Sequence, residues 1–154
     1  DFMKKKLMNH TYFDDTTFSL RGKNFYITHG DGVLSWDYGY RILKKIIRSP
    51  FFIWCFRLLH PTLAYKIARK VSRTENHPEL PEEVREKIRN ELKKYALTHF
   101  QKGFDYMVCG HYHLNEIIDV EKGKLAVLGD WQDDPSYAVF DGKELTLHQW
   151  ENDA

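Results

Sequence analysis

Apolar and polar positions alternate with two different periods along this chain. Short apolar runs bounded by polar turns predict β-strands at residues 17–20, 25–28, 104–109, 116–120, 125–128, 137–140 and 145–150. From Pro81 to about Gln101, apolar residues recur every three or four positions, which predicts one long helix. This helix leads directly into the run at 104–109, and such a helix-to-strand unit is typical of α/β proteins. We therefore predict an α/β fold.

Residues 36–73 have a different pattern, with three helical segments separated by two breaks. Ser49-Pro50 ends the first segment and His60-Pro61 ends the second, because proline disrupts a helix interior. The first and third segments each carry an apolar stripe, and we expect the stripe of the third to face inward. These stripes are Ile42, Leu43, Ile46 and Ile47, and Leu63, Ile67, Ala68 and Val71.

The same stretch concentrates positive charge. Nine basic residues and a single acid, Asp37, give residues 36–73 a net charge of +8, which leaves −7 for the rest of a chain whose total is +1. Two interpretations are open: a helical subdomain with solvated cations, or a basic, apolar lid that contacts anionic lipid. Aromatic and basic residues also suit single-stranded nucleic acid, but no nucleic-acid-binding module is recognisable, so we expect no nucleic-acid partner.

Length and composition indicate one folded unit. A chain of 154 residues with 42% hydrophobic residues can build one core.

Cys55 and Cys109 lie far apart in apolar runs, as expected for reduced thiols in an intracellular protein, with a disulfide as the alternative. Arg57 interrupts the longest apolar run, so we expect no membrane span. Residues 1–9 have the pattern of a helix end, and residues 74–80 are expected to form a linker.

Histidines follow two of the predicted strands. His29 comes directly after the strand at 25–28, and His111 and His113 follow the strand at 104–109. Ligands bind beyond the carboxyl ends of strands in open α/β sheets, and residues i and i+2 of an extended loop point the same way. The three imidazoles could therefore share a crevice and bind transition metal, although an exposed turn is the alternative. Asp130 also follows a strand, but a turn-stabilising role is expected for it.

The motifs around these histidines resemble those of a known family. HGDG at residues 29–32, GHYH at 110–113 and LGDW at 128–131 are similar to the later motifs of the calcineurin-like metallophosphoesterases. The helical insertion, which includes DYGY at 37–40, resembles that of the UDP-2,3-diacylglucosamine diphosphatase branch. The resemblance implies a four-layer αββα sandwich with a helical lid at about residues 36–75. Residues 1–154 would then form the carboxyl-terminal portion of the domain.

The resemblance also implies roles for particular residues. His29 and His111 would bind one divalent ion and His113 a second, with manganese expected and magnesium, zinc or iron as alternatives. Asp31 would act in catalysis by orienting a ligand or water, with capping of its turn as the alternative. The residues implied in substrate binding are Asp37, Tyr40, Lys66, Arg69 and Arg73.

The earlier motifs of the family, D-x-H, G-D-x-x-D and G-N-H-D, do not occur in this sequence. Asn9-His10 lacks the required glycine, and we expect His10 not to be a ligand. The missing groups would lie in an amino-terminal half of the same polypeptide. His60, His77, His99 and His148 are not assigned to the site, and His77 and His99 are expected to be exposed.

The activity implied is metal-assisted hydrolysis of UDP-2,3-diacylglucosamine to UMP and 2,3-diacylglucosamine 1-phosphate, a step of lipid A biosynthesis. The implied partners are a UDP-linked acylated sugar and an anionic membrane surface, with a cytoplasmic location at the inner membrane face. The alternatives are a phosphoesterase of another substrate, a site with a single metal ion, and a non-catalytic lipid-binding domain in which the histidines are a remnant.

Overall fold

The computed structural model of the chain describes residues 12, 14–72, 80–131 and 134–150. The predicted helix end at residues 1–9, most of the predicted linker, His10, Arg73 and His77 lie outside these residues. The side chains of residues 70–72 are likewise not described.

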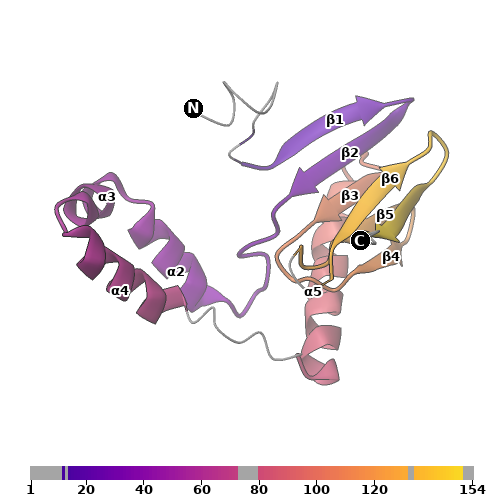
Figure 1. Cartoon of the computed structure of the whole chain (residues 1–154). Coiled ribbons are helices and arrows are strands. Elements are labelled where there is room, and N and C mark those ends of the chain that lie inside the picture. The colour runs from indigo at the N-terminus through magenta and orange to yellow at the C-terminus, as the bar shows by residue number, and fades with distance from the viewer. Residues whose placement is uncertain (1–11, 13, 73–79, 132–133, 151–154) are drawn as a thin grey trace.

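A five-stranded mixed sheet forms the centre of the fold (Figure 1). Its strands are β1 (Thr16–Leu20), β2 (Lys23–Thr28), β3 (Tyr106–Cys109), β4 (Glu116–Val120) and β5 (Gly123–Val127), in the spatial order β1-β2-β3-β5-β4. The three central strands β2, β3 and β5 are parallel, whereas β1 and β4 run antiparallel to their neighbours at the two edges. Thr28 pairs with Cys109, and Cys109 pairs with Val127, so the three parallel strands end at one level.

The two faces of the sheet are covered by different elements. Helix α5 (Glu82–Phe100) packs Ile88, Leu92 and Ala96 against one face, where Met107 and Leu125 are fully buried. The hairpin of β6 (Ser136–Phe140) and β7 (Leu145–Gln149) covers the other face, around a core of Phe25, Tyr106, Ala126 and Leu145. The predicted α/β class is confirmed. The four-layer sandwich stays a prediction, because the described residues form three layers.

Helix α5 lies where it was predicted, but the exposure predicted for one of its residues, His99, was wrong. It begins after Pro81 with Glu82 and Glu83 in the first turn, where negative charge is favourable. His99, predicted to be exposed, is buried, with 8% of its surface accessible. The Tyr26 ring lies 4.0 Å from its own, and its Nδ1 is 3.0 Å from the carbonyl oxygen of Tyr95. The prediction was wrong because Tyr26 comes from a strand that is distant in sequence.

Three further helices form the helical region, which we define as α2 (Tyr38–Ile47), α3 (Pro50–Arg57) and α4 (Pro61–Ser72). The breaks fall where the prolines predict them, and the Ser49 hydroxyl accepts a hydrogen bond from the Phe52 amide at 3.2 Å, which caps α3. Figure 1 shows these helices to one side of the sheet.

The apolar side chains of the helical region are much more exposed than those of α5. Neither α2 nor α3 contains a buried residue. Leu63 and Ile67, predicted to face inward from α4, are 49% and 38% exposed, and Ala68 is exposed as well. The inward prediction was therefore wrong for these three residues. No helix among the described residues is long and apolar enough to span a bilayer.

Candidate functional site

The candidate site lies where the parallel strands end. His29 follows β2, Gly110 and the two later histidines follow β3, and Gly129 and Asp130 follow the end of β5. Because these strands are parallel and in register, their carboxyl ends share one edge of the sheet. The sheet therefore gathers the histidines that the sequence separates by more than eighty positions.

The rings of His29 and His111 lie close together in this site. Their ring centroids are 5.0 Å apart, with an angle of 69° between the ring planes. The turn that carries His29 is stabilised by two hydrogen bonds: the Gly30 amide donates to the Thr28 hydroxyl at 3.1 Å, and the Tyr112 hydroxyl donates to the Gly30 carbonyl at 2.8 Å. This separation suits two imidazoles that bind one cation, since each nitrogen would lie about 2 Å from zinc or a similar ion.

His113 lies beside a different residue. Its Nδ1 is 3.4 Å from the Oδ2 atom of Asp130, and both side chains are partly exposed. His111 and His113 have φ angles of 64° and 50°, so the loop is not extended at these residues. The argument that an extended loop points both imidazoles the same way therefore does not apply to this chain.

Asp130 is the site residue to which the sequence interpretation gave too little weight. Its backbone carbonyl accepts a hydrogen bond from the Asp134 amide at 2.9 Å, as expected of a turn residue, but its carboxylate faces His113. Its position after a strand end was the signal that could have identified it. A carboxylate beside a histidine Nδ1 can fix the tautomer and orientation of that ring.

The protonation state of His111 is set mainly by its surroundings. Burial lowers the pKa of His111, and the charge of nearby His29 lowers it further, while Asp31 opposes both effects. Both leading causes disfavour the imidazolium form. A neutral imidazole keeps the lone pair that binds a metal ion.

Asp31 connects the site loop to the first helix of the helical region. Its carboxylate accepts a hydrogen bond from the Tyr40 hydroxyl at 3.1 Å and forms an ion pair with Lys44. Burial acts to raise the pKa of Asp31, but the hydrogen bonds from Lys44 and Tyr40 outweigh it, and the net pKa is lowered. The predicted catalytic residue is therefore ionised and is held by side chains of α2.

The described members of the predicted substrate-binding set lie at two separate helices, α2 and α4. The Tyr40 ring lies 5.8 Å from the His111 ring, so α2 reaches the histidine pair. Asp37 is the N-cap residue of α2, but its side chain makes no capping hydrogen bond. Lys66 and Arg69 are exposed on α4, and Arg73 lies outside the described residues.

The described residues bring potential metal ligands together in pairs. Among them, no group of three or more His, Cys, Asp or Glu side chains lies close enough to hold a metal ion. These pairs are His29 with His111 and His113 with Asp130. These donors fit part of a metal site, and further ligands would have to come from residues outside the described set.

The fold is that of an α/β protein with histidines at the carboxyl ends of its parallel strands. The chain is similar to curated proteins named UDP-2,3-diacylglucosamine hydrolase. The protein of Porphyromonas gingivalis is 30% identical over 170 aligned residues, which cover 99% of this chain and 64% of that protein. The protein of Pseudomonas putida is 30% identical over 124 residues, covering 77% of this chain and 50% of that protein. No protein-family model matches the chain.

These relatives confirm the predicted relationship to UDP-2,3-diacylglucosamine diphosphatases, for which the helical insertion with DYGY at residues 37–40 was the basis. The relatives are hydrolases by name, and their named substrate is UDP-2,3-diacylglucosamine. The chain spans between half and two thirds of their length.

Proposed function

We propose that this chain is the carboxyl-terminal portion of a metal-dependent hydrolase that cleaves the pyrophosphate of UDP-2,3-diacylglucosamine. Water would add across the P–O–P bridge, so that one product is UMP and the other is 2,3-diacylglucosamine 1-phosphate, a step of lipid A biosynthesis. The observation that carries the proposal is the His29–His111 pair at the sheet edge, in a chain aligned along 99% of its length with a hydrolase named for this substrate.

The proposed metal centre would be shared between this chain and residues beyond it. His29 and His111 would hold one divalent ion and His113 a second, with Asp130 orienting the His113 ring. When bound, such ions neutralise phosphoryl oxygens and make a water more acidic. Manganese is the proposed ion. Asp31 would hold Tyr40 and Lys44 beside the reacting groups.

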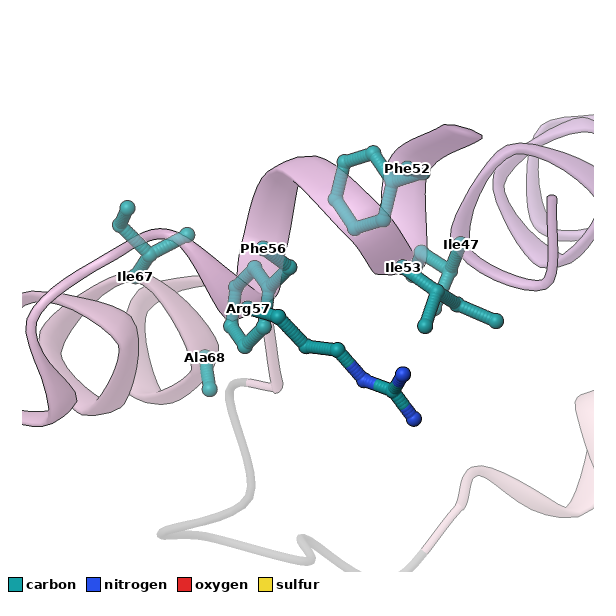
Figure 2. A pocket seen from close by; sticks show the side chains of 7 residues that line it. All are labelled: Ile47, Phe52, Ile53, Phe56, Arg57, Ile67 and Ala68. Atoms are coloured by element: carbon teal, nitrogen blue, oxygen red, sulfur yellow. The ribbon is translucent and has the colours of Figure 1, made fainter. Parts of the chain in front are cut away.

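The helical region offers a place for the acyl chains of the proposed substrate. A pocket of about 540 Å³ lies among its three helices and is lined by Ile47, Phe52, Ile53, Phe56, Arg57, Ile67 and Ala68. Figure 2 shows the guanidinium of Arg57 reaching away from these apolar side chains. Apolar pockets of several hundred Å³ bind ligands of this kind, and one polar group at the edge is usual.

The test is UMP release from UDP-2,3-diacylglucosamine by the complete protein with added manganese or magnesium. His111→Ala should reduce the rate at least about 100-fold, because loss of a metal ligand removes most of the metal's contribution. His148→Ala is the matched control, since His148 is an exposed histidine on β7, and it should keep the wild-type rate. Turnover of simple phosphodiesters but not of the lipid would instead indicate a phosphoesterase of another substrate.

The exposed apolar surface of the helical region favours a second candidate function, binding to an anionic membrane surface without catalysis. Phe51, Trp54 and Leu58 are 74%, 59% and 68% exposed and lie among basic residues. Such a surface is suited to the interface of anionic lipid. This function predicts binding to phosphatidylglycerol vesicles that survives chelation and alanine at His29, His111 and His113. Loss of binding on chelation, together with hydrolysis of the lipid substrate, would reject it. As an enzyme or as a binding domain, the protein would act at the cytoplasmic face of the inner membrane.

A further inference from the structure

Helix α2 has two opposite faces of different chemistry. Successive helical residues are about 100° apart, so residues at spacings of three, four and seven share a face. One face carries Arg41, Lys44, Lys45 and Arg48, and the opposite face carries Ile42, Leu43, Ile46 and Ile47. Ile47 lines the apolar pocket of the helical region. The basic face is therefore directed away from that pocket.

The basic face of α2 forms one wall of a groove. The other wall is the site loop after β2, and the groove has a volume of about 510 Å³. Its lining residues are Asp31, Gly32, Arg41, Lys44, Lys45 and Arg48. We call it the basic groove. Its size is within the usual range for a small-molecule site.

The basic groove keeps most of its positive charge uncompensated. Lys44 is neutralised by its ion pair with Asp31. Arg41 donates to the backbone carbonyls of Leu34 and Ser35, at 2.6 and 3.0 Å, and its guanidinium carbon lies 4.9 Å from the centre of the Tyr38 ring. No acid among the described residues neutralises its charge. Within the described part of the chain, the side chains of Lys45 and Arg48 have no ion-pair partner.

One residue that lines the basic groove also has a buried donor without a partner. The Nε atom of Arg41 is inaccessible to solvent and makes no hydrogen bond to any described residue. A buried N–H without an acceptor is costly, so a movement of the Arg41 side chain that brings this donor to an anionic oxygen would be favourable. The groove lining therefore combines net positive charge with a residue that has an unused donor.

We propose that the basic groove binds a phosphate group of a nucleotide, with Lys45 and Arg48 as its principal contacts and Arg41 as a supporting one. The inference rests on the proposed function, because the named substrate of the relatives contains a nucleoside diphosphate. Tyr40 connects the groove to the histidine pair, since its hydroxyl bonds to Asp31 and its ring lies 5.8 Å from His111. Helix α2 thus separates an apolar pocket for acyl chains from an anion site for the nucleotide.

A membrane contact would explain the same charges less well. Cations that bind a lipid surface are most useful beside the apolar side chains that enter the lipid. In α2 the cations are on the opposite face from the isoleucines and line a hollow beside Asp31. This geometry favours a phosphate group bound in the groove over contact with a lipid surface.

The test is calorimetric titration of UMP into the complete protein with EDTA present, so that metal-bound phosphate does not contribute. Replacing both cations, Lys45→Gln with Arg48→Gln, should weaken UMP binding at least about tenfold, because each charge-assisted contact is strong. The charge-conserving pair Lys45→Arg with Arg48→Lys should stay within about threefold of wild type. Lys102→Gln is the control, since Lys102 is exposed after α5, near the end of the sheet opposite the site.

Each outcome of this titration decides a separate question. Wild-type protein without measurable UMP binding, or a double variant that binds UMP like wild type, would overturn the groove proposal. A double variant that loses binding to phosphatidylglycerol vesicles but keeps UMP affinity would reassign the cations to the membrane. If UMP binding depends on Lys45 and Arg48 but UDP-2,3-diacylglucosamine is not hydrolysed, the anion site stands and the proposed function fails.

Discussion

Helices α5 and α2 have similar apolar stripes, but only the stripe of α5 is buried in this structure. In α5, Leu92 and Ala96 are fully buried against the central sheet. In α2, Ile42 and Ile46 remain 60% and 49% exposed. The stripe is a local property of the sequence, whereas burial depends on whether another element lies against it. A stripe without such an element is available for a ligand or a surface, as proposed for the helical region.

The α/β core and the helical region also differ in how their charged side chains are paired. The α/β core places its cations next to acids: Arg89 donates to Glu116 at 2.8 Å, and Lys23 donates to Asp105 at 2.8 Å. In the helical region, Lys44 pairs with Asp31, but Lys45 and Arg48 form no ion pair with any described residue. Charge in the core therefore supports the fold, whereas the charges of Lys45 and Arg48 are available for binding.

The largest expected difference between the α/β core and the helical region is the loss of stability when a leucine is replaced by alanine. Leu92→Ala in α5 should lower the free energy of unfolding by about 3 kcal/mol, because it leaves a cavity in a fully buried site. Leu63→Ala in α4 should cost about 0.5 kcal/mol or less, since half of that side chain is already exposed. Urea unfolding measures both. Equal costs would mean that the helical region is packed in solution.

This contrast also shows how far the sequence could predict the molecule. Strand positions, the proline breaks and α5 depend on local patterns, and the structure confirms them. The burial of His99 and the exposure of Leu63 depend on neighbours distant in the chain, so local patterns predicted both incorrectly. The strand-end pattern also predicted that His29 and His111 lie close together, as they do, whereas their role as metal ligands stays a prediction.

The partners of the site residues could not be predicted in this way. The left-handed backbone at His113 and the contact with Asp130 follow from how two loops meet. Local patterns also do not show that Asp31 would bond to Tyr40 and Lys44. These contacts are set by the register of the sheet and by the position of α2.

The second-largest expected loss of stability comes from replacing a glycine of the core, Gly123. A Cβ atom at Gly123 would lie 2.6 Å from the Phe100 ring, where β5 meets the end of α5. Gly123→Ala should therefore lower the free energy of unfolding by about 2 kcal/mol, the usual cost of forced repacking. Urea unfolding is again the measurement. A variant as stable as wild type would mean that Phe100 can move aside freely, and the double variant with Phe100→Leu should recover part of any loss.

A smaller effect is expected for an ion pair of the core. The hydrogen bond from Lys23 and a second from the Asn24 amide lower the pKa of Asp105 below its usual value of 3.8. A lowered pKa contributes stability that is present above pH 3.8 and is lost as the pH falls through the folded-state value. Asp105→Asn should lower the free energy of unfolding by about 1 kcal/mol at pH 7. The difference from wild type should disappear in strong acid.

The control for this pair is the more exposed Asp119, whose carboxylate lies 3.8 Å from Lys124. Asp119→Asn should change the free energy of unfolding by less than about 0.5 kcal/mol at any pH. Unfolding in urea at several pH values measures both variants. A gap for Asp105→Asn that persists at pH 2 would show that the loss is not due to the charge.

The smallest expected effect has the opposite sign and lies in the helical region. Gly39 is exposed in α2, and a Cβ atom there would meet no other atom within 4 Å. Gly39→Ala should stabilise α2 by about 0.5 kcal/mol, because alanine loses less conformational entropy than glycine on entering a helix. Slower amide hydrogen exchange along α2, with unchanged exchange in α5, is the expected result. Faster exchange in α2 would indicate a neighbour that covers Gly39 in solution, and the contrast between a packed core and an open helical region would then not hold at this position.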